Sequence, residues 1–222
     1  GKIESNFTIY DGATINEIEL SDKSPVRVIQ SEVEKKCIEK IEETISAGDT
    51  LGGIFELVAT NVPVGLGSHI SWDNKLDGKI AQSIMSIPGI KGVEIGKGFQ
   101  CGGLYGSEFH DEIFYEEERY TRKTNNAGGI EGGISNGENI VVRAVMKPIP
   151  TLKKPLKSIN MDTKEVSLAH VERSDVCAVP SASIVGESML AFTLAKEFHQ
   201  KFGGDSIEEV MKNYRDYIKY IT

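Results

Sequence analysis

The sequence is poor in the features that mark secreted, disulfide-rich and membrane proteins. Its three cysteines, Cys37, Cys101 and Cys177, are odd in number and unclustered, which indicates reduced intracellular thiols in place of a disulfide or zinc framework. No apolar run approaches the roughly 20 residues of a membrane-spanning helix, and the first residues lack the apolar core of a signal peptide. We therefore expect a cytoplasmic protein without a membrane span.

Positive charge is also scarce. The 222 residues contain 25 Lys and Arg against 33 Asp and Glu, which gives a net charge of -8 at pH 7. Because nonspecific nucleic-acid binding depends on Lys and Arg that neutralise phosphates, we expect no nucleic-acid partner. A small anion can still be held locally. Hydrophobic residues at 39% and charged residues at 26% are ordinary for a globular fold, and the length allows one large or two small domains.

Strands and one helix are expected near the start of the chain. Alternating apolar residues over 7–10 and 14–20, on either side of the turn Asp11-Gly12, predict two strands. The stretch Ser31-Glu32-Val33-Glu34 is typical of a capping box. An apolar stripe of helical spacing follows it and stops at Gly48, so the pattern predicts a helix between these two signals.

The middle of the chain alternates between strand and helix patterns. Residues 53–60 and 92–95 predict strands, and residues 76–87 predict a helix that a proline stops. Residues 101–137 predict a long loop region with hairpin segments. Within it, the acidic stretch 111–118 is interrupted by apolar residues, which favours a strand or hairpin edge over an acidic tail.

The C-terminal part adds two strands and two helices. The stretch "NIVVRAVM", residues 139–146, predicts a buried strand, and residues 164–170 predict another. An apolar stripe of helical spacing over 189–198 predicts a helix that ends at Gly203-Gly204, and Ser206-Ile207-Glu208-Glu209 is typical of a capping box for a last helix. Strands and helices in mixed order, with hairpin-like spacing, predict an α+β fold with antiparallel sheet.

One loop is unusually rich in glycine and asparagine. The stretch "TNNAGGIEGGISNG", residues 124–137, holds five glycines and three asparagines. Glycines permit positive φ and a close approach of backbone N–H groups to an anion. The stretch lacks the Gly-Lys-Ser/Thr of a P-loop and the Gly-x-Gly-x-x-Gly of a dinucleotide site. It predicts contact with a ligand, and the alternative is a wide turn between two strands.

A second candidate stretch follows the expected buried strand. Lys147-Pro148-Ile149-Pro150-Thr151 combines a cation, a rigid backbone and a hydroxyl group at a strand end. Functional sites are often found at such a place. The alternative is an ordinary proline-rich turn, because the stretch by itself is a weak signal.

A third candidate stretch is "RSDVCAVPSASIVGESM", residues 173–189. Arg173 and Asp175 lie two positions apart, so on an extended segment both side chains emerge on one face while Ser174 turns away. The small residues from Ala178 to Ser183 then lead into a helix and leave room for a ligand beside a helix N-terminus. The alternative for the charged pair is a surface salt bridge, which contributes little.

These stretches resemble the chorismate synthase family. Arg173-Ser174-Asp175-Val176-Cys177, followed by Gly186-Glu187, resembles the C-terminal signature of that family. The stretches "VPVGLGSHISWDNKLDGKIAQSIMSIPGIKGVEIGKGF" (62–99), "TNNAGGIEGGISNG" and "VMKPIPT" match it in order and spacing. The resemblance covers nearly the whole chain. It implies antiparallel sheets packed with helices in a β-α-β sandwich.

The resemblance is to the C-terminal part of such an enzyme. The family's Gly-Asp/Glu-Ser-His-Gly motif, a second catalytic histidine in an arginine-rich stretch and an Arg-x-Ser-Ala-Arg-type motif are not found in this sequence. His69 lies in "GSHIS" of the middle motif, without the following glycine, so no catalytic role is carried over to it. Residues 1–222 are thus expected to be the C-terminal portion of a single, incomplete chorismate synthase domain. We expect His110, His170 and His199 to be structural or exposed, and we expect no metal site.

The family's activity is that of a carbon-oxygen lyase. Chorismate synthases convert enolpyruvylshikimate phosphate to chorismate and phosphate, the last step of the shikimate pathway, which leads to aromatic amino acid biosynthesis. Phosphate and a ring hydrogen leave from opposite faces of the substrate, and the reaction requires reduced FMN although it is redox-neutral overall. An anionic cofactor and an anionic substrate in one site would explain clustered cations in an acidic protein. The resemblance also implies a homotetramer.

Cofactor contacts are implied for three stretches. Residues Lys147, Pro148, Ile149, Pro150 and Thr151 would hold the flavin phosphate and ribityl chain, with Lys147 as the cation and Thr151 as the hydroxyl donor. Gly132 would allow a close backbone approach that a bulkier residue would block. Pro88 and Gly89 match a further turn that contacts FMN in the family.

Catalytic, substrate and further flavin contacts are implied for the segment from Arg173 to Asp175 and for the residues from Asn125 to Ala127. Arg173 would contact the flavin or the anion of the substrate. Asp175 would lie near the flavin N5 and act as the base partner in removal of the ring proton. Asn125 and Ala127 would line the flavin, and Asn126 would line the substrate.

The missing motifs leave two interpretations of the chain. In the first, it carries half of an FMN-dependent lyase site; because both acid histidines belong to the absent motifs, residues 1–222 alone are then expected to be inactive. In the second, it is a non-catalytic structural and assembly fragment that retains part of the flavin site. In either case we expect the Gly-Asn loop, the Lys147 turn and the Arg173–Asp175 segment to converge on one cleft.

Overall fold

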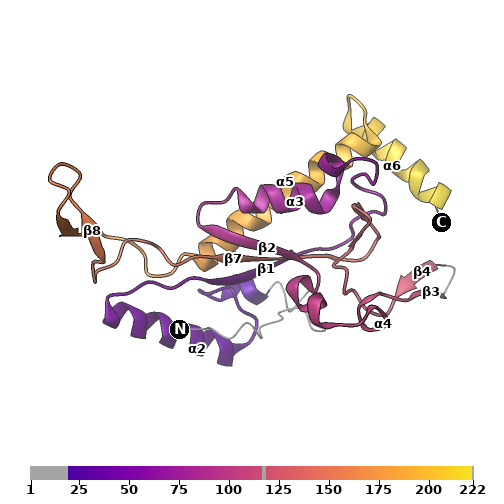
Figure 1. Ribbon diagram of the computed structural model, residues 1–222. Coiled ribbons are helices and arrows are strands. Elements are labelled where there is room, and N and C mark those ends of the chain that lie inside the picture. The colour runs from indigo at the N-terminus through magenta and orange to yellow at the C-terminus, as the bar shows by residue number, and fades with distance from the viewer. Residues whose placement is uncertain (1–19, 117–118, 222) are drawn as a thin grey trace. The chain divides into compact units, whose positions relative to one another are not determined.

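The computed structural model describes residues 20–116 and 119–221 (Figure 1). The strands expected at 7–10 and 14–20 lie outside the described residues, apart from Leu20. The chain divides into two compact units. Of the described residues, the first unit comprises 20–56, Gly89–Lys91 and Val145–Ile184, and the second comprises Leu57–Pro88, Gly92–Ala144 and 185–221.

A three-stranded sheet has the strand order β1-β7-β2. Its strands are β1 (Gly53–Ala59), β7 (Ile140–Met146) and β2 (Ile90–Ile95). The three strands predicted from the sequence at these places are confirmed, with ends that differ by one or two residues. β7 is the central strand. Its nearly continuous apolar sequence agrees with burial on both faces, because the adjacent residues Ile140, Val141 and Val142 are all buried.

β2 and β7 run antiparallel. The backbone N–H of Gly96, just after β2, donates to the carbonyl of Val141 at 2.9 Å, and the N–H of Lys147, just after β7, donates to the carbonyl of Gly89 at 2.9 Å. The end of each strand therefore lies beside the beginning of the other, which is the antiparallel arrangement.

β1 is antiparallel to β7 as well. Gly52, just before β1, lies so close to the end of β7 that a Cβ on it would be 2.9 Å from Pro148. The other end of β7 is fully buried, since Ile140 and Val142 are both 0% exposed. The antiparallel sheet expected from the order of the elements is confirmed.

The first unit contains the helix α2 (Ser31–Ala47). It ends as expected at Gly48, whose φ of 69° is left-handed and whose N–H donates to the carbonyl of Ile45 at 3.1 Å. The capping box predicted at Ser31 is wrong. The helix begins one residue earlier than the box requires, with Gln30 at the N-cap and no side-chain hydrogen bond there, so the Ser31 hydroxyl is not at the capping position.

An exposed hairpin also belongs to the first unit. β8 (Lys157–Ile159) pairs antiparallel with β9 (Val166–Leu168), at the tip of an extended part of the chain (Figure 1). The strand predicted over 164–170 is confirmed as the shorter β9, whereas β8 was not predicted. Its residues Lys157, Ser158 and Ile159 are all exposed, so they carry no one-sided apolar pattern from which a strand could be inferred.

The second unit holds the best-buried apolar side chains, and α3 (Leu76–Met85) supplies half of them. Leu76, Ile80 and Ile84 recur every four residues along one face of the helix and are each 0% exposed. The helix ends two residues before the predicted Ile87. The other apolar side chains under 2% exposed are Leu66, Ile140 and Val142.

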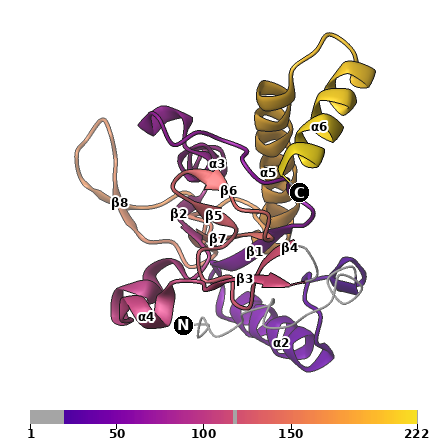
Figure 2. The same ribbon diagram turned by 90° about the vertical axis from the view of Figure 1, so that its right-hand side faces the viewer.

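Two long helices close the chain, α5 (Val179–Phe202) and α6 (Ile207–Ile221). They lie side by side in Figure 2. The ring centroids of Phe198 and Phe202 on α5 are each 5.3 Å from that of Tyr214 on α6. The capping box predicted for α6 is confirmed: the N–H of Glu209 donates to the Ser206 hydroxyl at 3.2 Å, and the N–H of Ser206 donates to the Glu209 carboxylate at 3.3 Å.

α5 begins ten residues before the stripe from which it was predicted. The small residues expected to lead into a helix form its first turns instead, apart from Ala178, which precedes the helix. Room for a ligand beside them stays a prediction. Pro180 is compatible with this start, because the first turn of a helix needs no N–H donor from it.

Short elements fill most of the region that was predicted as loop. They are η3 (Gly98–Gly103), α4 (Gly106–Phe109), the hairpin of β3 (Ile113–Glu116) and β4 (Arg119–Arg122), and the hairpin of β5 (Ile130–Glu131) and β6 (Ile134–Ser135). The hairpin edge expected in the acidic stretch is confirmed at β3. Two further 3-10 turns are η1 (Ser21–Lys23) and η2 (Trp72–Asn74).

None of the helices in the described part of the chain is long and apolar enough to cross a bilayer. Cys37, Cys101 and Cys177 are all free thiols, as expected.

Candidate functional site

The glycine-rich loop folds into the tight turn of the β5–β6 hairpin. Gly132 and Gly133 form the turn, with φ of 62° and 90°. A side chain at Gly133 would press against Lys75, 2.6 Å from its Cγ, whereas nothing lies within 4 Å of the position that a Cβ on Gly132 would take. Gly132 therefore borders open space, as a close approach to a ligand would require.

Two other glycines allow two backbone segments to approach each other closely. Gly96 and Gly128 have φ of 58° and 65°, and a Cβ on Gly96 would lie 2.5 Å from the backbone nitrogen of Gly128. This crossing lets the N–H of Lys97 donate to the carbonyl of Asn126 at 2.9 Å. Some glycines of the loop thus let backbones cross, and Gly132 faces open space. Contact of the loop with a ligand stays a prediction.

Asp111 holds the beginning of this loop from the other side. Its Oδ1 accepts hydrogen bonds from the Thr124 hydroxyl at 2.6 Å and from the N–H of Asn126 at 2.8 Å, and its Oδ2 accepts one from the N–H of Ala127 at 3.0 Å. Burial alone would raise the pKa of Asp111, but these hydrogen bonds, with a smaller effect of the Arg122 charge, lower the pKa below its ordinary value. The carboxylate is therefore held in its charged form.

The side chains of Asn125 and Asn126 form hydrogen bonds within the protein. The amide of Asn125 donates to the carbonyl of Asn139 at 2.7 Å and accepts from the N–H of Gly129 at 2.8 Å. The amide of Asn126 donates to the carbonyl of Phe109 at 2.8 Å. These two predicted site residues thus shape the loop with their side chains.

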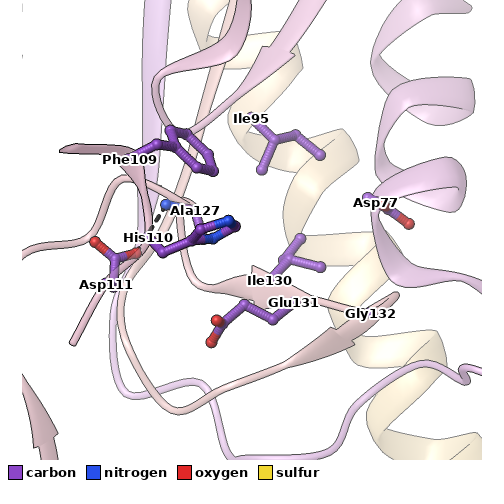
Figure 3. A pocket seen from close by; sticks show the side chains of 9 residues that line it. All are labelled: Asp77, Ile95, Phe109, His110, Asp111, Ala127, Ile130, Glu131 and Gly132. Carbon is purple, nitrogen blue, oxygen red and sulfur yellow. Dashed lines mark hydrogen bonds between the residues drawn. The ribbon is translucent and has the colours of Figure 1, made fainter. Parts of the chain in front are cut away.

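A pocket of about 440 Å³ lies beside the loop (Figure 3). Figure 3 shows Asp77 on α3 across from Phe109, His110 and Asp111, with a dashed line for the hydrogen bond between Asp111 and Ala127. Of the predicted site residues, Ala127 and Gly132 line it, and Asn125 and Asn126 do not. The full lining is Asp77, Ile95, Phe109, His110, Asp111, Ala127, Ile130, Glu131 and Gly132.

The pocket is acidic and partly apolar. Asp77, Asp111 and Glu131 carry its carboxylates, and its lining includes no Lys or Arg. One of these charges is balanced, because Arg122 lies 2.7 Å from Glu131. Such a lining disfavours a phosphate group, and its apolar side chains and carboxylate acceptors suit an uncharged part of a ligand that donates hydrogen bonds.

The Lys147 turn belongs to the first unit and is anchored by three hydrogen bonds. The N–H of Lys147 donates to the carbonyl of Gly89 at 2.9 Å, the hydroxyl of Thr50 donates to the carbonyl of Ile149 at 2.6 Å, and the hydroxyl of Ser174 donates to the carbonyl of Thr151 at 2.9 Å. In each of these hydrogen bonds the turn contributes a backbone group and no side chain. The Lys147 side chain is left exposed.

The segment from Arg173 to Asp175 lies against that turn. Arg173 and Asp175 are exposed and Ser174 is half-buried and bonded to Thr151, so the predicted alternation of faces is confirmed. The segment is fixed further along, where the N–H of Leu51 donates to the carbonyl of Val176 at 2.8 Å. No ion pair joins Lys147, Arg173 or Asp175 to another residue within the described ranges.

Two of the three predicted site stretches are therefore brought together. The Lys147 turn and the Arg173–Asp175 segment meet in the first unit, and Gly89 of the further predicted turn joins them. Asn125, Asn126, Ala127 and Gly132 belong to the second unit. That all three stretches share one cleft stays a prediction.

Several pocket residues were missed by the sequence analysis. Phe109, His110 and Asp111 precede the glycine-rich loop by more than ten residues, and no spacing pattern connects them to it. The one hint in the sequence is the polar trio His110-Asp111-Glu112, which lacks metal-ligand spacing. Among residues 20–116 and 119–221, no group of three or more His, Cys, Asp or Glu side chains is arranged to hold a metal ion.

Comparison with known proteins identifies the family. The model of the chorismate synthase family matches residues 3–198. The chain belongs to the chorismate synthase family. It is 56% identical to the chorismate synthase of Geotalea daltonii over 207 residues, which is 90% of this chain and 53% of that protein. It is also 56% identical to the chorismate synthase of Alkaliphilus metalliredigens over 204 residues, 91% of this chain and 54% of that protein.

The fold agrees with this family. A crystal structure of a chorismate synthase matches with a TM-score of 0.78 and 46% sequence identity, over 91% of this chain and 53% of that one. The α+β fold expected from the sequence is confirmed as part of the chorismate synthase fold. The chain spans about half the length of the chorismate synthases it matches.

Proposed function

We propose that this chain supplies part of a chorismate synthase active site, which converts enolpyruvylshikimate phosphate to chorismate and phosphate with reduced FMN. The observation that carries the proposal is the meeting of the Lys147 turn and the Arg173–Asp175 segment in one unit, with both cations exposed, in a chain of the chorismate synthase family. The reaction is an elimination, in which the substrate loses a phosphate and a ring proton and gains a double bond.

The residues present fit the phosphate end of FMN. Lys147 offers an ammonium group without an ion-pair partner among the described residues, and the backbone of its turn is fixed by hydrogen bonds from Thr50 and Ser174. Pro148 and Pro150 stiffen the same turn, so little conformational entropy is lost when it binds an anion. Thr151 adds a hydroxyl donor, and Ile149 completes the binding turn.

Arg173 and Asp175 would act at the reacting centre. Reduced FMN, when bound, supplies electron density to the substrate transiently. Arg173 would hold the flavin or the substrate through an anion, and an exposed guanidinium suits this task because it can make two parallel hydrogen bonds to such a group. The Asp175 carboxylate would take part in accepting the ring proton, as a base whose charge no described cation neutralises.

The second unit would line the uncharged parts of the ligands. Ala127 and Gly132 border an acidic, partly apolar pocket, which is suited to a flavin ring and disfavours its phosphate. Asn125 and Asn126 would act by holding the loop, since their amides bond to carbonyls of the same unit.

Further properties of the family extend the proposal. We propose that residues 1–222 are the C-terminal portion of a single chorismate synthase domain and that the complete protein acts as a cytoplasmic homotetramer. Sedimentation of the complete protein as a monomer at all concentrations would contradict the last point. A second candidate is a structural and assembly role without turnover, in which the chain retains part of the flavin site.

Binding of FMN tests the cofactor part of the proposal. Lys147→Ala should weaken FMN affinity of the chain by roughly tenfold or more, because it removes a hydrogen-bonded charge from the phosphate. Lys157→Ala is the matched control: it removes the same charge from the same unit, on the exposed strand β8. Fluorescence titration of FMN measures both. Equal affinities for the two variants would refute the role of Lys147.

Turnover tests the chemistry. In the complete enzyme, Asp175→Asn keeps the shape of the side chain and removes its basicity, so kcat should fall by roughly 10²-fold or more while FMN affinity changes little. Residues 1–222 alone should form no chorismate with reduced FMN. Anaerobic assay of chorismate by its ultraviolet absorbance measures both, and chorismate formation by the isolated chain would show that the two histidines assigned to the absent motifs are not required.

A further inference from the structure

Asp111 is a buried carboxylate that the proposed chemistry does not use. It is 9% exposed, and it joins residues that are more than ten positions away in the sequence. Its two oxygens accept three hydrogen bonds, from the Thr124 hydroxyl and from the N–H groups of Asn126 and Ala127. Ala127 is one of the loop residues that line the pocket.

The loop is held from the opposite side as well. The N–H of Lys97 donates to the carbonyl of Asn126 at 2.9 Å, and Gly96 lies directly against the backbone of Gly128. Gly96 is supported in turn by Arg143, whose guanidinium donates to its carbonyl at 2.7 Å. Residues Asn126 to Gly128 are therefore held from two sides, by Asp111 on one and by Gly96 and Lys97 on the other.

A carboxylate suits this position and an amide does not. Oδ1 accepts from both Thr124 and Asn126, and Oδ2 accepts from Ala127, so both oxygens act as acceptors. In Asp111→Asn, one of them becomes an NH₂ group, which cannot accept a hydrogen bond. That group would face at least one N–H donor of the loop, and a backbone N–H would lose its partner.

Asp111 also connects the two walls of the pocket. Phe109 and His110 precede it in the chain and line one side, and Ala127 lines the adjoining side (Figure 3). The Asn126 amide reinforces this connection through the carbonyl of Phe109 at 2.8 Å. Any movement of Asp111 away from the loop would therefore change the shape of the pocket.

We infer that Asp111 is a positioning residue for the ligand, which holds Ala127 and the Phe109–His110 wall in the arrangement that binds the uncharged part of the cofactor. The inference rests on the proposed function, because it assigns Asp111 to the flavin pocket. Asp111 does not touch the ligand's reacting atoms in this role. It acts through Asn126 and Ala127, whose N–H groups it orients.

Flavin affinity separates this role from a purely structural one. Asp111→Asn should weaken FMN binding by the chain by roughly tenfold, since a charged hydrogen-bond acceptor is lost. Thr124→Val removes one of the three hydrogen bonds and leaves both N–H groups bonded, so its effect should be smaller. Glu112→Gln is the matched control, because it changes the neighbouring exposed carboxylate in the same way and should bind FMN like the unsubstituted chain.

The rate of amide hydrogen exchange at Asn126 and Ala127, measured without flavin, is a second measurement that does not depend on the cofactor. Faster exchange at these two amides in Asp111→Asn, together with weaker FMN binding, supports the inference. Unchanged FMN affinity in a folded Asp111→Asn variant overturns the inference, and so does unchanged amide exchange.

If the unsubstituted chain fails to bind FMN, the proposed function fails, and with it the ligand role of Asp111. If Asp111→Asn does not fold, Thr124→Val decides, and FMN binding equal to that of Glu112→Gln counts against the inference.

Discussion

Loss of the Lys79 ammonium is expected to destabilise the second unit strongly. Lys79 on α3 lies 2.8 and 2.9 Å from the two carboxylate oxygens of Glu197 on α5. The side chain of Glu197 is only 3% exposed and that of Lys79 is 18% exposed. Lys79→Met therefore leaves a carboxylate buried without a partner, and removal of one member of a buried ion pair costs about 3–5 kcal/mol.

The exposures also predict an asymmetry between the two partners. Glu197→Met leaves Lys79 unpaired, but this longer and more exposed side chain can move its ammonium group into water. We expect Glu197→Met to cost less than Lys79→Met. The double variant Lys79→Met with Glu197→Met should be close to the unsubstituted chain in stability, because apolar side chains replace both charges.

Equilibrium unfolding in urea measures these free energies. Lys40 and Glu43 provide a control pair: they lie 3.2 Å apart at side-chain exposures of 45% and 68%, so Glu43→Gln should cost less than about 1 kcal/mol. The reasoning is refuted if Lys79→Met costs no more than this control. It is refuted as well if the double variant is as unstable as Lys79→Met alone.

Two further predictions concern a glycine and a thiol. Gly96→Ala should destabilise the chain by about 1–3 kcal/mol in the same urea assay, because φ is 58° and the new Cβ would meet Gly128; Gly102→Ala, with nothing within 4 Å of its Cβ, is the control and should be nearly neutral. Burial, and to a smaller extent electrostatic repulsion by Cys177, raise the pKa of Cys37, so at pH 8 iodoacetamide should label Cys37 more slowly than the exposed Cys101. Equal rates by mass spectrometry would contradict this.

The sequence by itself determined the elements whose signals are local. "NIVVRAVM" predicted β7 because a strand buried on both faces has a nearly continuous apolar run, and Gly48 predicted the end of α2 because glycine adopts the left-handed conformation without strain. The box from Ser206 to Glu209 predicted the start of α6 through two hydrogen bonds between residues three apart. The motifs around Lys147 and Arg173 also predicted the family, since their order along the chain is itself a sequence property.

Only the tertiary structure decided where non-local contacts lie. The small residues at the start of α5 carry no apolar period, so their helical state depends on what packs around them. The Ser174 hydroxyl reaches Thr151 across 23 positions, and Asp111 reaches Ala127 across 16. Such pairs leave no periodic trace, because each depends on the backbone path between its members. The residues of the proposed chemistry were named from motifs along the sequence, whereas the carboxylate that holds the Gly-Asn loop could be found only in the folded chain.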